Sequence, residues 1–160
     1  MKRGAFSLVE AIVAVGLVGI AIVSLLAASN SFTKVNAAGR DMTTAEFLVE
    51  QIRELMAPLP VTDPQTGAGT FGAEEGGVAG YDDVDDFDGA SFSPPISADR
   101  QSLTGFSAFR QQVTVENVSA GDFDQVVGDH GSNFVKVTVE VYMNSESLGS
   151  VSWIRANIGH

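Results

Sequence analysis

The N-terminal part of the chain carries two successive hydrophobic patterns, and the first is an almost unbroken apolar run. From Ala11 to Ser29 no residue is charged, and the run is close to the ~20 residues of helix that cross a bilayer core. Lys2 and Arg3 precede it, and the positive-inside bias keeps this end of the chain cytoplasmic. We therefore expect a membrane-spanning helix over residues 6–29, with one acidic residue, Glu10, near its start.

The second pattern is amphipathic. Between Asn30 and Met56, apolar or small residues recur at alternating spacings of three and four, which is typical of a helix with one buried face. Pro58 and Pro60 then end the helix. We expect residues 30–57 to continue the first helix and to pack on a globular head. The stripe expected to join helix and head consists of Val35, Met42, Val49 and Met56.

Residues 58–160 are expected to form the head. The stretch from Val61 to Ser107 is rich in Gly, Pro, Asp and Ser, which predicts a long and mostly irregular connection. Three runs of alternating apolar and polar residues follow, typical of antiparallel strands with one solvated face. They span about 109–118, 134–143 and 150–158, and residues 144–147 form the turn between the last two. The expected fold class is α+β, with the second half of a long helix covering a small antiparallel sheet.

Charge and cysteine content narrow the possible partners. The chain of 160 residues has a formal net charge of −11, and because such an acidic surface repels phosphates we expect no nucleic-acid partner. The absence of cysteine excludes disulfides and thiolate-ligated metals. The two histidines, His130 and His160, lie in a Gly/Asp loop and at the C-terminus, and no Ser-His-Asp or phosphate-loop spacing accompanies them. We expect neither enzymatic activity nor a resident cofactor.

The acidic segment 81–89, with the sequence YDDVDDFDG, is the sharpest local feature of the head. Its five carboxylates repel one another unless they are solvated, hydrogen-bonded or bound to a metal. An EF-hand alignment on Gly89 fails, because it places Val84 and Pro95 at ligand positions. Two hypotheses stay open: a calcium site of another geometry, or aspartates of which some cap turns or a short helix while the rest face water, with Tyr81 and Phe87 packed inward. The candidate metal ligands are Asp82, Asp83, Asp85, Asp86 and Asp88.

The N-terminal sequence KRGAFSLVE, residues 2–10, resembles the class III leader of type IV prepilins and type II secretion pseudopilins. In that family a prepilin peptidase cuts before a Phe that lies four residues ahead of a Glu, usually after Gly, where this chain has Ala5. The resemblance implies a leader of residues 1–5, cleavage between Ala5 and Phe6, and N-methylation of Phe6. It also implies that Glu10 pairs with the N-terminal amine of a neighbouring subunit, which removes the cost of an isolated charge in low dielectric.

The head carries a second resemblance. The acidic segment, the strands around 113–115 and 135–141, and the closing residues 154–157 are similar to the MshD group of minor prepilins from the mannose-sensitive haemagglutinin (MSHA) pilus. This implies a pilin-like fold and a minor type IV pilin that serves pilus assembly and cell adhesion. The implied partners are other pilin subunits, the prepilin peptidase, an inner-membrane assembly platform and, before assembly, membrane lipid. The implied location is a single pass of the inner membrane with a periplasmic head, and later an extracellular pilus or periplasmic pseudopilus.

Three alternatives remain at this point. A minor pseudopilin of a type II secretion system has the same kind of N-terminus. A membrane-anchored periplasmic domain that binds calcium or another ligand would keep its leader and would not depend on Glu10. A secretory signal peptide cleaved near Ala28 would leave a mature protein that begins near Asn30. Neither the signal peptide nor a plain anchor explains the acidic residue.

Overall fold

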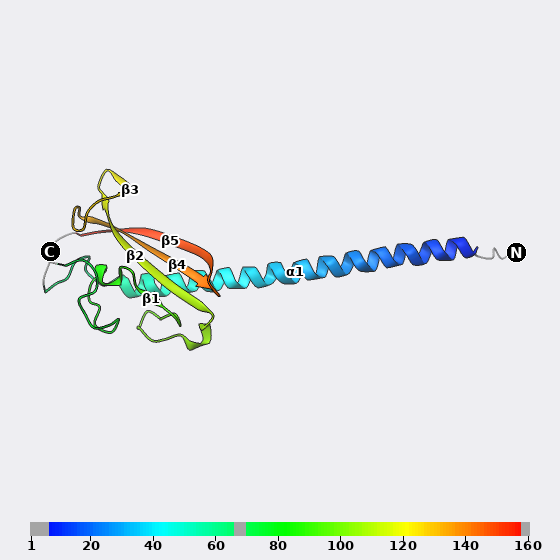
Figure 1. Ribbon diagram of the computed structural model, residues 1–160, viewed down its shortest axis with the longest axis horizontal. Helices are drawn as coiled ribbons and strands as arrows, with labels where there is room; N and C mark the ends of the chain where they lie inside the picture. The colour runs from blue at the N-terminus through cyan, green and yellow to red at the C-terminus, as the bar shows by residue number, and fades with distance from the viewer. Residues whose placement is uncertain (1–6, 66–69, 158–160) are drawn as a thin grey trace. The chain divides into compact units, whose positions relative to one another are not determined.

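The computed structural model describes residues 7–65 and 70–157, and the chain divides into two compact units, residues 1–41 and 42–160 (Figure 1). The helix α1 (Leu8–Met56) begins in the first unit and ends in the second. The second unit also contains all the strands. The expected leader 1–5 and Phe6 lie outside the described residues.

The first unit consists of α1 up to Asp41, and its side chains are exposed along nearly all of its length. The most apolar window of α1 has a mean hydropathy of 2.7, so this one helix of the described chain is long and apolar enough to cross a membrane. Three of its hydroxyl groups bond within the helix: Ser24 donates to the carbonyl of Ile20 at 2.9 Å, Ser31 to that of Ala27 at 3.1 Å and Thr33 to that of Ser29 at 3.0 Å.

The second unit is built on an antiparallel sheet in which β1 (Ser91–Phe92), β2 (Phe109–Ser119), β4 (Phe134–Met143) and β5 (Glu146–Ala156) lie in that order. A short strand, β3 (Asp122–Val126), turns back to pair with the end of β2 (Figure 1). Two single-turn 3₁₀ helices, η1 (Asp85–Phe87) and η2 (Thr104–Phe106), lie in the connection before β2. One long N-terminal helix with an antiparallel sheet confirms the α+β fold class.

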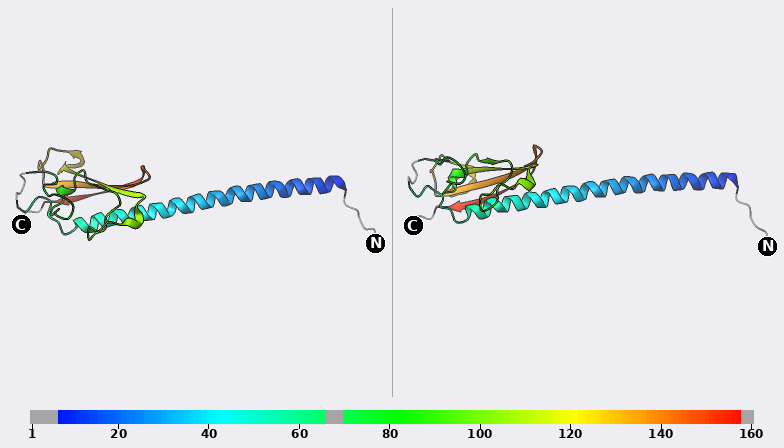
Figure 2. Two further views of the ribbon diagram at one scale, coloured as in Figure 1. Left: turned by 60° about the horizontal axis from the view of Figure 1, so that its bottom comes forward. Right: turned by 90° about the horizontal axis from the view of Figure 1, so that it is seen from below.

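The core lies between one face of the sheet and the last turns of α1 (Figure 2). The register pairs Val113 with Val139 and Val115 with Val137, so the alternating valines of β2 and β4 meet on the same face. From α1, Leu48 and Ile52 are fully buried against them. Branched aliphatic side chains on both layers explain why these segments adopt a helix and strands that pack together.

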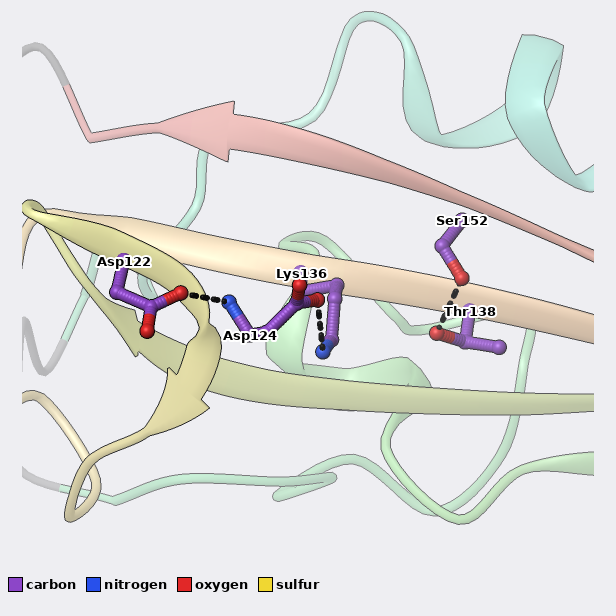
Figure 3. Close-up of polar contacts among 5 residues, drawn as sticks. All are labelled: Asp122, Asp124, Lys136, Thr138 and Ser152. Atoms are coloured by element: carbon purple, nitrogen blue, oxygen red, sulfur yellow. Dashed lines mark hydrogen bonds and ion pairs between the residues drawn. The ribbon is translucent and has the colours of Figure 1, made fainter.

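The opposite face of the sheet is polar, as the alternation predicts. Thr138 on β4 and Ser152 on β5 share a hydrogen bond of 2.9 Å between their hydroxyls (Figure 3). Lys136 lies 3.9 Å from the carboxylate of Asp124, whose own N–H donates to the Asp122 carboxylate at 3.0 Å. The ion pair reaches from β4 to β3, so the solvated side of the sheet holds this short strand in place.

The prediction that a stripe of four apolar residues joins the helix to the head is correct for two of them. Val49 and Met56 are buried, but Val35 is 68% exposed and Met42 is 55% exposed. The expected span of residues 30–57 is therefore too long, because burial on α1 begins at Ala45. Residues 30–41 belong to the first unit, in whose described residues no strand lies, so their apolar spacing is not matched by a sheet of the same unit.

The sheet also differs from expectation at its edges. The turn between β4 and β5 contains only Asn144 and Ser145, both with positive φ (49° and 75°), which is the geometry of a two-residue hairpin. β5 consequently begins at Glu146 rather than at residue 150. Neither β1 nor β3 was expected from the sequence. Both strands are short, and β3 is exposed along its whole length.

Candidate functional site

The start of α1 holds Glu10, the residue singled out for filament assembly. Ser7 precedes the helix, and its hydroxyl accepts a hydrogen bond of 3.2 Å from the N–H of Glu10. A serine at the N-cap with a glutamate three residues later is the sequence of a capping box, and a carboxylate in the first turn also complements the helix dipole. The S-x-x-E spacing of Ser7 and Glu10 is the sequence signal for this local role, which was not among the roles expected of Glu10. Glu10 is exposed, so its place in the helix cap leaves its carboxylate accessible.

The acidic segment 81–89 is fixed on the head by its apolar residues. Val84 and Phe87 are fully buried, and the ring of Phe87 packs edge-on against Tyr81 with 4.9 Å between centroids. The N–H of Val84 donates to the carbonyl of Pro60 at 3.0 Å, which ties the segment to the chain just after α1. The expectation that Tyr81 and Phe87 pack inward is confirmed, with Tyr81 half-buried.

The aspartates cap the turn around η1, as one hypothesis held. The carboxylate of Asp86 accepts hydrogen bonds from the N–H groups of Asp82 (2.8 Å) and Asp83 (3.3 Å), and Asp83 accepts one from the N–H of Asp86 (3.0 Å). Of the aspartates outside these bonds, Asp88 faces water as that hypothesis held, but Asp85 does not. Asp83, Asp85 and Asp86 are at most 1% exposed, because the packing of Phe87 and Val84 carries the whole turn into the head.

Two clusters of carboxylates form around this turn. Asp63 joins Asp82 and Asp83, with one oxygen from each lying within 4.8 Å of the others. Glu74 and Glu75 form the second cluster with Asp86 under the same limit. Asp63, Glu74 and Glu75 were not among the candidate ligands. Their only signal is that they are acidic residues in the Gly- and Pro-rich connection, which does not show that the fold brings them to the segment.

The other two candidate ligands lie outside both clusters. Asp88 is exposed, and its carboxylate accepts a hydrogen bond of 2.9 Å from the N–H of Val115 on β2. Asp85 is buried and lines a cavity of about 100 Å³ with His130 and Ser132. The Ser132 hydroxyl accepts a hydrogen bond from the N–H of Phe134 at 3.0 Å and donates to the carbonyl of Val118. Because both partners of the Ser132 hydroxyl are main-chain groups, this hydroxyl has a structural role. His160 lies outside the described residues.

The clusters bury several carboxylate oxygens without a hydrogen-bond partner. The side-chain amide of Gln65 reaches one oxygen of Asp82 at 2.7 Å but leaves the other unpartnered. Arg100 is the nearby cation, yet its guanidinium donates to the carbonyls of Val78, Ala79 and Tyr81 instead. Arg100 therefore holds the backbone of the loop in place but does not pair with the carboxylates of the clusters. The unpartnered oxygens are Glu75 Oε2, Asp82 Oδ1, Asp83 Oδ2, Asp85 Oδ1 and Asp86 Oδ1.

This environment disfavours ionised carboxylates. Burial, together with the adjacent Asp83 carboxyl, raises the pKa of Asp85 to about 9. Burial also raises the pKa of Asp83. For Glu75, the neighbouring side chain of Asp86 is the main cause that raises the pKa, followed by desolvation. For Asp83, Asp85 and Glu75, burial and the neighbouring carboxyl groups disfavour the charged form, so a proton or a cation stabilises each of them.

Comparison with known proteins finds no matching family model, no matching curated protein and no matching solved structure.

Proposed function

We propose that this protein is a minor type IV pilin of the MSHA type. A prepilin peptidase cleaves it between Ala5 and Phe6 and methylates the new N-terminus, and the subunit is then assembled through α1 into a pilus or its tip complex. The observation that carries the proposal is the exposed carboxylate of Glu10 in the first turn of a helix that is apolar and uncharged for the next several turns.

The energetics of this carboxylate support assembly. A charged side chain deep in a bilayer costs about 2.5–3.5 kcal/mol or more, so Glu10 is expensive in a helix that only anchors a domain. Cleavage before Phe6 creates an α-amine four residues away in sequence. In a filament, the amine of one subunit and the Glu10 carboxylate of the next neutralise each other in a low dielectric, where the attraction is strongest.

The surface of α1 also suits lateral packing between helices. Gly16 and Gly19 lie three residues apart, and a Cβ atom added at either would meet no other atom within 4 Å. Small residues let neighbouring helices approach closely in an apolar medium. The exposed aliphatic side chains around them, such as Leu17 and Val18, then provide the contact area of a filament core.

The proposal is tested by the N-terminus of the mature protein and by assembly of variants. Intact mass and N-terminal sequencing of native protein should give a methylated Phe6, and a start near Asn30 or at Met1 would refute the proposal. Glu10→Gln should abolish incorporation into filaments while the precursor is still cleaved. Ser7→Ala is the matched control, because it removes the helix cap but keeps the carboxylate, and it should assemble. If both variants fail equally, the capping role explains Glu10.

The same N-terminal chemistry serves a minor pseudopilin of a type II secretion system. The two assemblies are distinguished by where the protein is found: surface pili sheared from cells would contain the minor pilin, whereas a pseudopilin would remain with the cell envelope. A third function, an anchored periplasmic domain that binds calcium or another ligand, is favoured by the two carboxylate clusters. It predicts an uncleaved chain whose behaviour does not change in Glu10→Gln.

A further inference from the structure

We propose that the two carboxylate clusters of the head bind calcium at two adjacent positions, one held by Asp63, Asp82 and Asp83 and the other by Glu74, Glu75 and Asp86. Only two of the five candidate ligands from the acidic segment share the first position, and one contributes to the second. The inference rests on the second unit alone. It stands or falls independently of cleavage, methylation or filament assembly.

The first argument is that the central aspartates are buried with one oxygen each left over. Asp83 is 0% exposed and Asp86 is 1% exposed. Each uses one oxygen to accept backbone N–H bonds, Oδ1 in Asp83 and Oδ2 in Asp86. The second oxygen of each has no partner and is out of contact with water. The turn therefore fixes both carboxylates while leaving one oxygen of each aspartate unsatisfied, and a buried unpaired carboxylate oxygen is strongly unfavourable.

The second argument concerns charge. The two clusters bring six carboxylates together. The ion pairs found in the described parts of the chain join Arg53 to Glu50 and Lys136 to Asp124, so neither neutralises a cluster. Arg100 approaches but binds three backbone carbonyls of the loop. The turn around η1 thus holds anionic oxygens in a fixed arrangement, and neither these two ion pairs nor Arg100 brings a positive charge to them, which is what a bound cation provides.

The donor set selects calcium. All six ligands are carboxylates, and hard oxygen donors suit Ca²⁺ and Mg²⁺, whereas Zn²⁺ prefers nitrogen and sulfur. Ca²⁺ accepts six to eight oxygens in irregular geometry, so each three-carboxylate cluster can be completed by water and by second oxygens of the same side chains. Mg²⁺ requires near-octahedral geometry and retains its water, which fits a partly buried, irregular cluster less well.

Calcium at these positions would join segments that are distant in sequence. Asp63 follows α1 closely, and the Val84–Pro60 hydrogen bond already brings the acidic segment to this point. The second position attaches Glu74 and Glu75 to Asp86 of η1. Bound calcium is therefore expected to stabilise the connection between helix and sheet, because an ion that binds only the folded state raises its stability.

The test uses the full-length protein in detergent after removal of divalent ions with a chelator. Addition of about 2 mM CaCl₂ should raise the melting temperature by several degrees, since extracellular calcium sites have dissociation constants of about 10⁻⁴–10⁻³ M. The same concentration of MgCl₂ should have a smaller effect. The double variant Asp83→Asn/Asp86→Asn keeps the oxygens that accept the backbone bonds but removes both charges. It should lose the calcium response and melt no lower than the wild type without calcium.

Asp129→Asn is the matched control, because Asp129 is an exposed aspartate outside both clusters, and it should respond to calcium like the wild type. Direct binding to the wild type is measured by calorimetry, with two ions per chain expected. Absence of binding at about 5 mM calcium would overturn the proposal whatever the variants do. An equal calcium response in the wild type and the double variant would also overturn it.

Discussion

The side-chain amide of Gln111 donates a hydrogen bond of 2.8 Å to the main-chain carbonyl of Leu48, and this bond joins the centre of β2 to the last turns of α1. The same amide group donates to the carbonyl of Ile96 at 3.1 Å and accepts from its N–H at 2.8 Å. Gln111 is fully buried among aliphatic side chains. One polar residue in the core thus holds helix, sheet and the connection between them.

Replacing Gln111 should therefore destabilise the head strongly. Gln111→Leu fills a similar volume but leaves the N–H and C=O groups of Ile96 buried without partners, which should lower the free energy of unfolding by about 2–4 kcal/mol. Urea unfolding of the full-length protein in detergent measures this. Gln112→Leu is the control. Gln112 points to the other face of β2 and is only half-buried, so its replacement should change the free energy of unfolding by no more than about 0.5 kcal/mol. Equal effects of the two variants would contradict this role.

The end of α1 depends on a residue near the far end of the chain. The guanidinium of Arg155 on β5 donates to the carbonyl of Met56 at 2.8 Å and to that of Leu59 at 2.7 Å. The first bond gives a second donor to the Met56 carbonyl, which already accepts from the N–H of Leu59, and both bonds place a positive charge just past the C-terminus of α1, where the helix dipole favours it. Arg155→Lys keeps the charge but loses the two-pronged geometry, and should lower the free energy of unfolding by about 1–2 kcal/mol.

Hydrogen exchange provides a local measurement of the same contact. Amides in the last turn of α1 should exchange faster in Arg155→Lys than in the wild type, because the helix end is less well held. Arg53→Lys is the control. Arg53 pairs with Glu50 at 3.2 Å on an exposed surface, with both side chains about half exposed, so its replacement should change stability by less than about 0.5 kcal/mol. Unchanged exchange at the helix end in Arg155→Lys would show that the turn at Pro58 holds it instead.

The long helix and three main strands could be predicted from the sequence because their periodicities extend over many residues. Short elements such as β1 carry too little pattern to predict. Gln111 could not be assigned to the core from its residue type, since glutamine is usually exposed, although its position, two residues before Val113, places it on the buried face of β2. The residue of α1 at which burial begins could not be predicted either. The apolar spacing continues through Val35, although this residue lies in the first unit, whose described residues contain no strand.

The candidate site was predicted in part for a related reason. Local sequence identifies the acidic segment and the capping aspartates of η1, since these bonds span only three or four residues. Asp63 and Glu75 reach the segment through tertiary contacts, including the three bonds that Arg100 makes to the backbone of residues 78–81. Contacts of this kind depend on how the whole connection between α1 and β2 folds, and no local sequence pattern specifies that.

The exposure boundary on α1 gives a prediction about where side chains contribute to the stability of the head. Ile52→Ala removes a fully buried side chain from the core and should lower the free energy of unfolding by about 2–5 kcal/mol, through lost burial and the cavity left behind. Val23→Ala, at a position 67% exposed in the first unit, should leave unfolding of the head unchanged. Near-ultraviolet circular dichroism of Trp153 follows head unfolding. A large effect of Val23→Ala would show that the two units unfold together.

Glu140, on the solvated face of β4, gives a prediction about how the stability of the head depends on pH. The Glu140 carboxylate accepts hydrogen bonds of 2.6 Å from the hydroxyls of Ser147 and Tyr142, and these bonds, that from Ser147 foremost, lower the pKa of Glu140 below its ordinary value of 4.5. Since the unfolded chain binds this proton more readily, the contribution of Glu140 to stability is fully present above pH 4.5. It should be lost as the pH falls through the lowered value, and solvent exposure keeps it small.

The carboxyl chemical shift of Glu140, followed by NMR during an acid titration, checks this directly. Ser147→Ala should move the Glu140 pKa upward toward its ordinary value, and Tyr142→Phe should do so to a lesser degree, since each removes one donor to the ionised form. Ser150→Ala is the control, because Ser150 lies opposite Glu140 in the register and is exposed, so its loss removes neither of these hydroxyl donors. An unchanged Glu140 pKa in Ser147→Ala would mean that solvent already replaces the hydroxyl, and that the hairpin after β4 is held by its turn geometry alone.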